Sequence, residues 1–238
     1  MKTYPRIAVL AGLLLTTAAV SIAHADDELD LTTSDAPAVS ATTEGYFGLL
    51  LPYQKPGGDL DGKRIYSNTD GVALVPKLKG AVGLGLVLGL KHNGAGGRGF
   101  ALEGSVQGSG HKSHMNGGPE MDAAIGLVSG DFKFFPTTGG PVEPYLQAGL
   151  CVASLNVKDG FLKAGGGSKE ETFNGSGLNL GAGVMTYLSP RFAVHLAAIY
   201  RFIEYNQLDY GTRARLGERL TGNILSVEFG MTFRFARH

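Results

Sequence analysis

The sequence predicts an all-β protein, an eight-stranded antiparallel up-and-down transmembrane β-barrel. Three observations lead to this fold class: eight segments of alternating apolar and small or polar residues, connections that are alternately long and short, and a second face with few charges. Alternation with a period of two indicates a strand with one apolar face. Alternating connection lengths predict a meander with long loops at one end and short turns at the other.

The stretch 80-GAVGLGLVLGLKH-92 shows the alternation most clearly, although two other interpretations exist. Its glycines do not fit the dinucleotide-binding fingerprint, because the third is one place late and a turn follows instead of a helix. Val82 to Leu90 is far shorter than the ~20 apolar residues of a membrane-spanning helix. A strand remains, and Gly83, Gly85 and Gly89 on one face predict a crowded interior or a close backbone approach there.

The segments follow one another along the chain. The predicted strands are 44–53, 82–90 (with a start as early as 72), 99–108, 123–135, 144–157, 177–188, 191–205 and 223–235. The long connections are 54–71, 109–122, 158–176 and 206–222, and the short ones are 92–98, 136–143 and 189–190. The fourth strand is clear only in its second half, because Ile125 and Leu127 lie on the otherwise polar side.

Alternation alone does not say which face is wet, since a soluble barrel also alternates, with its apolar face inward. Here the face opposite the apolar one consists mostly of Gly, Ala, Ser, Asn and Gln, which suit the narrow interior of an eight-stranded barrel. The apolar face carries aromatic residues near the strand ends, as at membrane interfaces. We therefore expect the apolar face to contact lipid and the sheet to close, because lipid offers no hydrogen bonds to an open edge.

Three segments carry a family resemblance: PVEPYLQAGLCVASL, GLNLGAGVMTYLSPRFAVHLAAIYRF and NILSVEFGMTFRF. They resemble the small outer-membrane β-barrel family, which includes the OmpA-type transmembrane domain and the opacity-type surface proteins. The resemblance covers 44–235 and contains no catalytic motif. It implies a place in the outer membrane of a Gram-negative cell, with outer-membrane lipid and the outer-membrane assembly machinery as partners. Family members usually end on an aromatic residue, whereas Ala236, Arg237 and His238 follow Phe235 here.

The first residues predict export. Lys2 and Arg6 precede an apolar run, and Ala23-His24-Ala25 forms a small-residue cleavage site. This pattern is typical of a secretory signal peptide over 1–25, cut near Ala25, with a retained anchor as the alternative. Residues 26–43 are acidic and polar and predict a disordered tail, and 44–238 is the predicted barrel domain.

Composition excludes several classes. The formal net charge is zero, which gives no support to a nucleic-acid partner. The single cysteine, Cys151, excludes an internal disulfide framework and is expected to pack in the lumen.

The candidate site is the barrel lumen. If the apolar face is outward, charges of both signs gather inside, where they must be paired. The predicted polar network consists of Lys91, Glu103, Asp131, Lys133, His195, Arg201, Glu228 and Arg234. Such a network is either a structural plug or a narrow gated path for ions.

Other motifs point to chemistry less directly. His111, Ser113 and His114 form the best candidate for a nucleophile cluster or, with Met115, a metal site, but no scaffold or carboxylate orients them in the predicted loop. Asp59-Leu60-Asp61-Gly62 begins like a calcium loop without its remaining ligands. We predict no enzyme activity, no metal and no cofactor. Arg213, Arg215 and Arg219 are candidate contacts for lipopolysaccharide phosphates, because arginine pairs well with phosphate.

The expected function is that of a structural or surface-interaction protein of the outer membrane, with a plugged lumen and four exposed loops that could hold an extracellular ligand. A narrow porin-like channel for ions or small solutes is the alternative. A lipid-modifying outer-membrane enzyme is the third hypothesis.

Overall fold

The computed structural model describes residues 41–60, 64–67, 71–74, 77–114, 121–158, 170–209 and 213–236. The described part consists of strands joined by turns: β1 (Thr42–Gly58), β2 (Arg64–Ser67), β3 (Gly71–Leu74), β4 (Lys77–Leu78), β5 (Ala81–Asn93), β6 (Gly99–His114), β7 (Met121–Phe135), β8 (Val142–Lys158), β9 (Glu170–Ser189), β10 (Phe192–Asp209) and β11 (Arg213–Ala236). In these residues no helix is long and apolar enough to cross a membrane.

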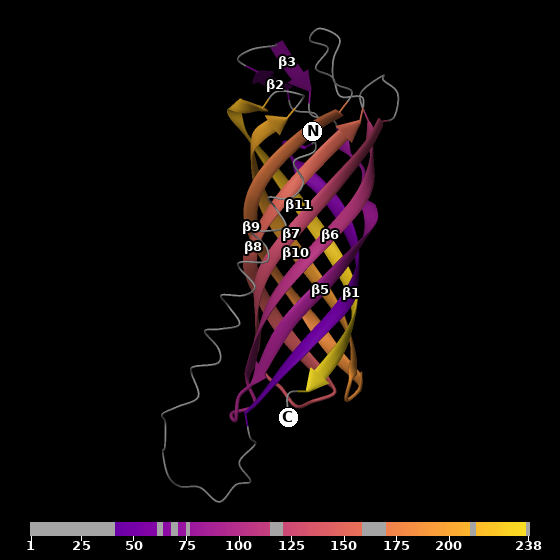
Figure 1. The fold of residues 1–238 in the computed structure, drawn as a ribbon, viewed down its shortest axis with the longest axis vertical. Helices are drawn as coiled ribbons and strands as arrows, with labels where there is room; N and C mark the ends of the chain where they lie inside the picture. Colours follow the sequence, from indigo (N-terminus) through magenta and orange to yellow (C-terminus); the bar gives the residue numbers. More distant parts are fainter. Residues whose placement is uncertain are drawn as a thin grey trace, which may run out of the picture.

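Eight long strands close into a barrel (Figure 1). Each of β1 and β5 to β11 pairs antiparallel with the next, and β11 pairs with β1 to complete the circle, with Gly48 opposite Thr232. Strands β2 and β3 pair with each other as a small hairpin, and β4 adds two residues beside β6. The predicted eight-stranded up-and-down barrel is thus confirmed.

The two ends of the barrel differ. Three short turns, 94–98, 136–141 and 190–191, lie at the end where β11 finishes, which is the lower end in Figure 1. Gly97 and Gly139 adopt positive φ angles of 69° and 90° in the first two turns, a conformation that favours glycine. The β2–β3 hairpin lies at the opposite end, which we call the loop end.

The strands run much further toward the loop end than the sequence predicted. Strand β9 has 20 residues and β11 has 24, so parts of the predicted loops 109–122, 158–176 and 206–222 are strands. Similarly, β1 begins at Thr42, inside the predicted tail, whose residues up to 40 lie outside the described part. These boundaries were wrong because paired strands continue beyond the stretch whose outer face is apolar.

The outer surface carries a broad apolar belt. Large exposed side chains alternate along every barrel strand, as with Leu86, which is 63% exposed, and Leu150, which is 66% exposed. The inward positions between them are small or polar. At Gly89 a side chain would overlap the phenol ring of Tyr46, and at Gly230 it would overlap the ring of His195. Gly89 and Gly230 therefore make room for large side chains in the interior, whereas Gly83 lies against the backbone of Gly108.

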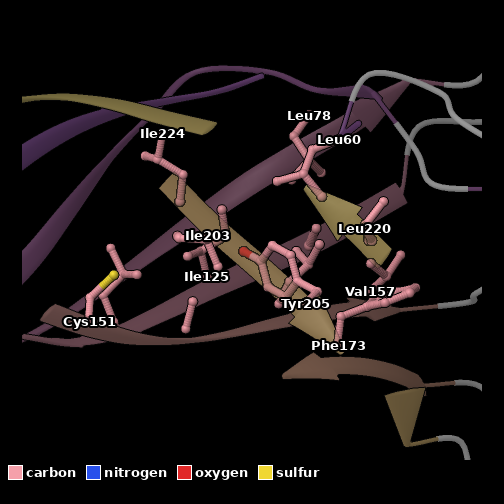
Figure 2. Packing of buried hydrophobic residues seen from close by; sticks show 14 of the residues in the cluster. Leu60, Leu78, Ile125, Cys151, Val157, Phe173, Ile203, Tyr205, Leu220 and Ile224 are labelled. Carbon is pink, nitrogen blue, oxygen red and sulfur yellow. The ribbon is translucent and has the colours of Figure 1, made fainter. Parts of the chain in front are cut away.

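Toward the loop end, the character of the two faces inverts. Outward positions become small or polar, while β7, β8, β10 and β11 turn apolar side chains inward. These inward-facing residues form a buried cluster at the loop end, which we call the outer apolar cluster, and Figure 2 shows most of it. Its members are Leu60, Leu78, Ala123, Ile125, Leu127, Cys151, Ala153, Leu155, Val157, Phe173, Ile203, Tyr205, Leu208, Leu220 and Ile224. The inversion explains why Ile125 and Leu127 break the pattern of their strand: they belong to a second, apolar section of the interior.

Candidate functional site

The middle of the lumen holds an ion pair between β6 and β7. The Lys133 ammonium lies 2.7 Å from a Glu103 carboxylate oxygen, and both side chains are buried. The Tyr46 hydroxyl donates to the same oxygen at 2.8 Å, and Lys133 also lies 4.7 Å from the centre of the Tyr145 ring. This combination of an ion pair, a hydroxyl donor and an aromatic face replaces water around the buried lysine.

A second buried ion pair joins β10 to β11. Arg201 is 1% exposed; one guanidinium nitrogen donates to Glu228 at 2.6 Å and another to Ser226 Oγ at 2.5 Å. Glu228 also accepts from the Gln107 amide at 3.1 Å. The carboxylate therefore has donors from two sides of the barrel, which ties opposite walls together.

At the short-turn end, a third ion pair closes the lumen. Lys91 binds Glu143, and the Tyr187 hydroxyl lies 2.7 Å from both the lysine nitrogen and that carboxylate. Glu143 also accepts from the backbone N–H of Gly139 at 2.8 Å, which fixes the β7–β8 turn. The sequence prediction placed Glu143 in a turn and missed this role, although it shares the inward phase of Tyr145.

The remaining predicted lumen residues also lie inside the barrel. Arg234 binds Glu44 near the short-turn end, and its guanidinium lies 4.4 Å from the Tyr187 ring centre. Asp131 accepts from the Asn179 amide at 3.0 Å. His195 is 3% exposed, and its Nδ1 has no hydrogen-bond partner among the described residues. The eight predicted residues thus face one lumen. They do not form a single network, because most of them belong to separate ion pairs at different heights along the lumen.

A polar chain leads from the second ion pair toward the loop end. Gln54 donates to Gln107 at 3.2 Å, Ser109 Oγ donates to Gln54 at 2.6 Å, and Ser109 Oγ lies 2.7 Å from His111 Nε2. His111 lies above the apolar belt, with its Nδ1 2.8 Å from the carbonyl of Lys79, and burial lowers the pKa of this imidazole below its usual value. The chain forms a polar stripe beside the outer apolar cluster.

This arrangement corrects the predicted nucleophile cluster. His111 and Ser113 lie on β6 and are buried in the interior, not in an exposed loop, and His111 is hydrogen-bonded to Ser109. His114 ends β6, its side chain is not described, and Met115 lies outside the described residues. Within the described part of the chain, no group of three or more His, Cys, Asp or Glu residues could hold a metal ion.

Two other candidate motifs are only partly described. Residues 61–63, which include half of the calcium-like motif, lie outside the described residues, and Asp59 accepts from the backbone N–H of Thr221 at 2.9 Å. The backbone of Arg213 and Arg215 pairs with β10, so these residues and Arg219 lie on a strand and not in the predicted loop. Their side chains are outside the described part.

Chemically, the four lysine and arginine side chains predicted for the lumen, Lys91, Lys133, Arg201 and Arg234, are each paired with a carboxylate. Oppositely charged groups meet inside a narrow barrel whose exterior is apolar, which is the reverse of a soluble barrel. The fold is that of a small outer-membrane β-barrel. The architecture that the family resemblance implied is therefore confirmed by the strand register and the apolar exterior of the chain itself.

Solved structures similar to this one are outer-membrane proteins. OprG from Pseudomonas aeruginosa matches with 15% identity and a TM-score of 0.48, covering 83% of this chain and 96% of that chain. Ail of Yersinia pestis, in complex with the heparin analogue sucrose octasulfate, matches with 14% identity and a TM-score of 0.46, covering 83% and 100%. Neisserial surface protein A matches with 16% identity and a TM-score of 0.44, covering 80% and 97%.

These similarities are distant, and they do not assign a function to this chain. No protein-family model matches the sequence. No curated protein matches it either.

Proposed function

We propose that the protein is an outer-membrane barrel with a closed lumen, and that it acts as a structural or surface-interaction protein through its loop end. The observation that carries this proposal is the filling of the interior. Three buried ion pairs occupy the length of the belt, Lys91–Glu143, Lys133–Glu103 and Arg201–Glu228, and the outer apolar cluster packs above them. Charges already paired in this way offer no selective path to a permeating ion, because entry would require breaking a buried pair.

The orientation follows from the ends of the barrel. In outer-membrane barrels the short turns face the periplasm and the longer connections face outward. The loop end is therefore the external end, and lipid and lipopolysaccharide surround the belt. Export with removal of a signal peptide near Ala25, and insertion by the outer-membrane assembly machinery, complete this proposal. Contacts of Arg213, Arg215 and Arg219 with lipopolysaccharide remain part of it.

We also propose that the protein is not an enzyme. A hydrolase needs a nucleophile that substrate can reach. The hydroxyl of Ser109 contacts the imidazole of His111, as a nucleophile contacts its base, yet both side chains are buried inside the barrel wall. A substrate in the membrane or in the medium therefore has no access to this pair.

Conductance in a planar lipid bilayer tests the closed lumen. The mature chain is refolded and its insertion verified by a heat-dependent shift in electrophoretic mobility. We expect no discrete current steps from the wild type. Glu143→Ala/Lys91→Ala removes the pair that closes the short-turn end and serves as the comparison. Ion-selective steps from the wild type would replace the proposal with the narrow channel.

A further inference from the structure

The short connection between β4 and β5 at the loop end is held by its backbone on both sides. The N–H of Lys79 donates to the carbonyl of Lys112 at 2.9 Å, and the carbonyl of Lys79 lies 2.8 Å from His111 Nδ1. Leu78, immediately before it, is buried in the outer apolar cluster, whereas Lys79 is exposed. His111 therefore ties this connection to the interior side of β6.

The direction of each hydrogen bond in the polar chain is fixed by the inner end of the chain. Glu228 is paired with a guanidinium, so its carboxylate only accepts, and Gln107 must turn its NH2 group toward it. The amide oxygen of Gln107 then faces Gln54, which donates through its own NH2 group. The amide oxygen of Gln54 consequently accepts the one hydrogen of the Ser109 hydroxyl, at 2.6 Å.

His111 therefore receives no hydrogen from either neighbour. The hydroxyl of Ser109 directs its hydrogen to Gln54, so His111 Nε2 must be the donor in the 2.7 Å contact with Ser109 Oγ. The Lys79 carbonyl only accepts, so Nδ1 must be the donor in the second contact. Both ring nitrogens carry a hydrogen only in the imidazolium form. These contacts are therefore complete only when His111 is protonated.

A neutral imidazole has one N–H hydrogen and must give up one of these links. With the hydrogen on Nδ1, Ser109 has to turn toward His111, and the oxygen of Gln54, a residue that is 0% exposed, loses its donor. With the hydrogen on Nε2, the chain to Gln54 stays intact and the Lys79 carbonyl is released. Since Lys79 is exposed, water can replace the lost donor there. The second arrangement therefore costs less.

The other charged and titratable groups near His111 do not compete with this change. Lys79 meets the ring through its carbonyl, and Lys112 is paired with Asp122 at 2.6 Å on the outer surface. The thiol and phenol in the outer apolar cluster have ordinary pKa values of about 8.5 and about 10 and stay neutral where histidine titrates. The neighbours, element by element, are Lys79 in the connection, Gln54 on β1, Gly83 on β5, Lys112 on β6, Asp122 and Ala123 on β7, Cys151 and Tyr205 in the outer apolar cluster, and Arg201 and Glu228 at the far end of the polar chain.

We infer that His111 is a proton-dependent clamp for the β4–β5 connection: the imidazolium holds the Lys79 carbonyl, and the neutral imidazole, with its hydrogen on Nε2, releases it. The proton comes from the medium and binds Nδ1. No bond between heavy atoms changes, and the hydrogen bonds from Ser109 to Glu228 are the same in both states. The inference goes beyond the proposed function and does not depend on whether the lumen conducts.

The clamp closes in a mildly acidic medium. Burial disfavours the imidazolium and the Lys79 carbonyl favours it, with burial the larger effect, so the pKa of His111 lies below its ordinary value. The released form buries the same imidazole without the carbonyl, so acid favours the clamped form over the released form. The unfolded chain leaves the imidazole in water and gains most from acid, so the whole fold still loses stability.

Nuclear magnetic resonance of the refolded barrel in detergent micelles tests the clamp. The nitrogen shifts of the imidazole identify its protonation state and tautomer, and the carbon shift of the Lys79 carbonyl reports its hydrogen bond. Between about pH 8 and about pH 4, we expect one transition in both signals, with a midpoint below about 6.5. Above the midpoint His111 should carry its hydrogen on Nε2, and the backbone amides of Leu78 and Gly80 should show faster local motion.

Two variants and one control sharpen the test. S109A removes the hydroxyl that accepts from Nε2, so neutral His111 can place its hydrogen on Nδ1, and the Lys79 carbonyl should stay bonded over the whole pH range. H111Q should abolish the transition at Lys79. H92Q removes the histidine that contacts Thr43 at the short-turn end and should leave the transition unchanged.

Several results would overturn the inference. They are a Lys79 carbonyl shift that does not follow the titration of His111, a neutral wild-type imidazole with its hydrogen on Nδ1, and no proton uptake by His111 down to about pH 4. An S109A protein with the wild-type transition would overturn it as well. The tautomer of the wild type decides the question by itself if a variant does not fold.

Discussion

Replacing Arg201 with methionine tests whether the lumen is a dry, charge-paired core. The substitution keeps most of the side-chain length but removes the donors to Glu228 and Ser226. Glu228, which is 3% exposed, would then keep the Gln107 amide as a donor but lose its charged partner. Removing one member of a buried pair typically costs about 3–5 kcal/mol, because the other charge stays buried and uncompensated. We expect the free energy of unfolding to fall by about that amount.

A double-mutant cycle separates the pair from the loss of packing. Glu228→Gln and Arg201→Met/Glu228→Gln are measured beside the single variant. The double variant leaves no charge without its partner, so it should cost less than the sum of the singles, with an interaction energy of about 1–3 kcal/mol.

The assay is urea unfolding of the refolded barrel in lipid vesicles. The chain contains no tryptophan, so Tyr200→Trp on the lipid-facing side of β10 supplies a single fluorescent reporter in every variant. A cost below about 1 kcal/mol for Arg201→Met, together with additive effects in the cycle, would show that water solvates these charges. The closed-lumen argument would then be wrong.

Three further outcomes follow from the same structure. Gly89→Ala should destabilise the barrel by about 1–3 kcal/mol in urea unfolding because it overpacks the interior, whereas Gly108→Ala, with open space around it, should be close to neutral, and equal costs would refute the packing argument. Leu86→Arg places a charge in the middle of the belt and should cost about 2–4 kcal/mol, while Asn206→Arg, four residues beyond the exposed Phe202 of β10, should cost far less; similar costs would count against the proposed membrane depth. Burial lowers the pKa of His111, so the unfolded chain takes up its proton more readily, and stability should fall as pH drops below about 6.5. His111→Gln should show a smaller loss between pH 7 and pH 5, and an identical loss would remove His111 from the acid response.

The sequence could predict the barrel because membrane strands obey a strict period. Phe132 and Phe134 alternate with Asp131 and Lys133 without interruption, and one lipid-facing side makes that pattern unambiguous. The polar residues of the belt region could be assigned inward by the same phase. Their partners could not, because pairing depends on the stagger between strands and on side-chain length. Lys91 therefore appeared in the predicted network without Glu143.

The loop end could not be predicted by this pattern. Ile125 and Leu127 face inward there, while the outward positions beside Ile125 are the small residues Ala124 and Gly126, so the rule that apolar means outward fails. The segment around His111 was taken as a loop for the same reason, since its alternation involves serine, glycine and lysine and no apolar residues. A search for a reversal in the phase of apolar residues along one strand would have found the outer apolar cluster.

The inverted section has a consequence for how each strand finds its partner. In a uniform membrane strand, a slip of one residue exchanges the two faces and is rejected, but a slip of two residues keeps them and is only weakly opposed. On β7, β8, β10 and β11 the change from polar to apolar interior also marks a height. A two-residue slip would move an apolar side chain such as Ile224 toward the charges of the lumen, and bring a polar outward residue such as Asn223 into lipid. The position of the inversion along each strand therefore helps to fix the register between neighbouring strands, in addition to which face turns inward.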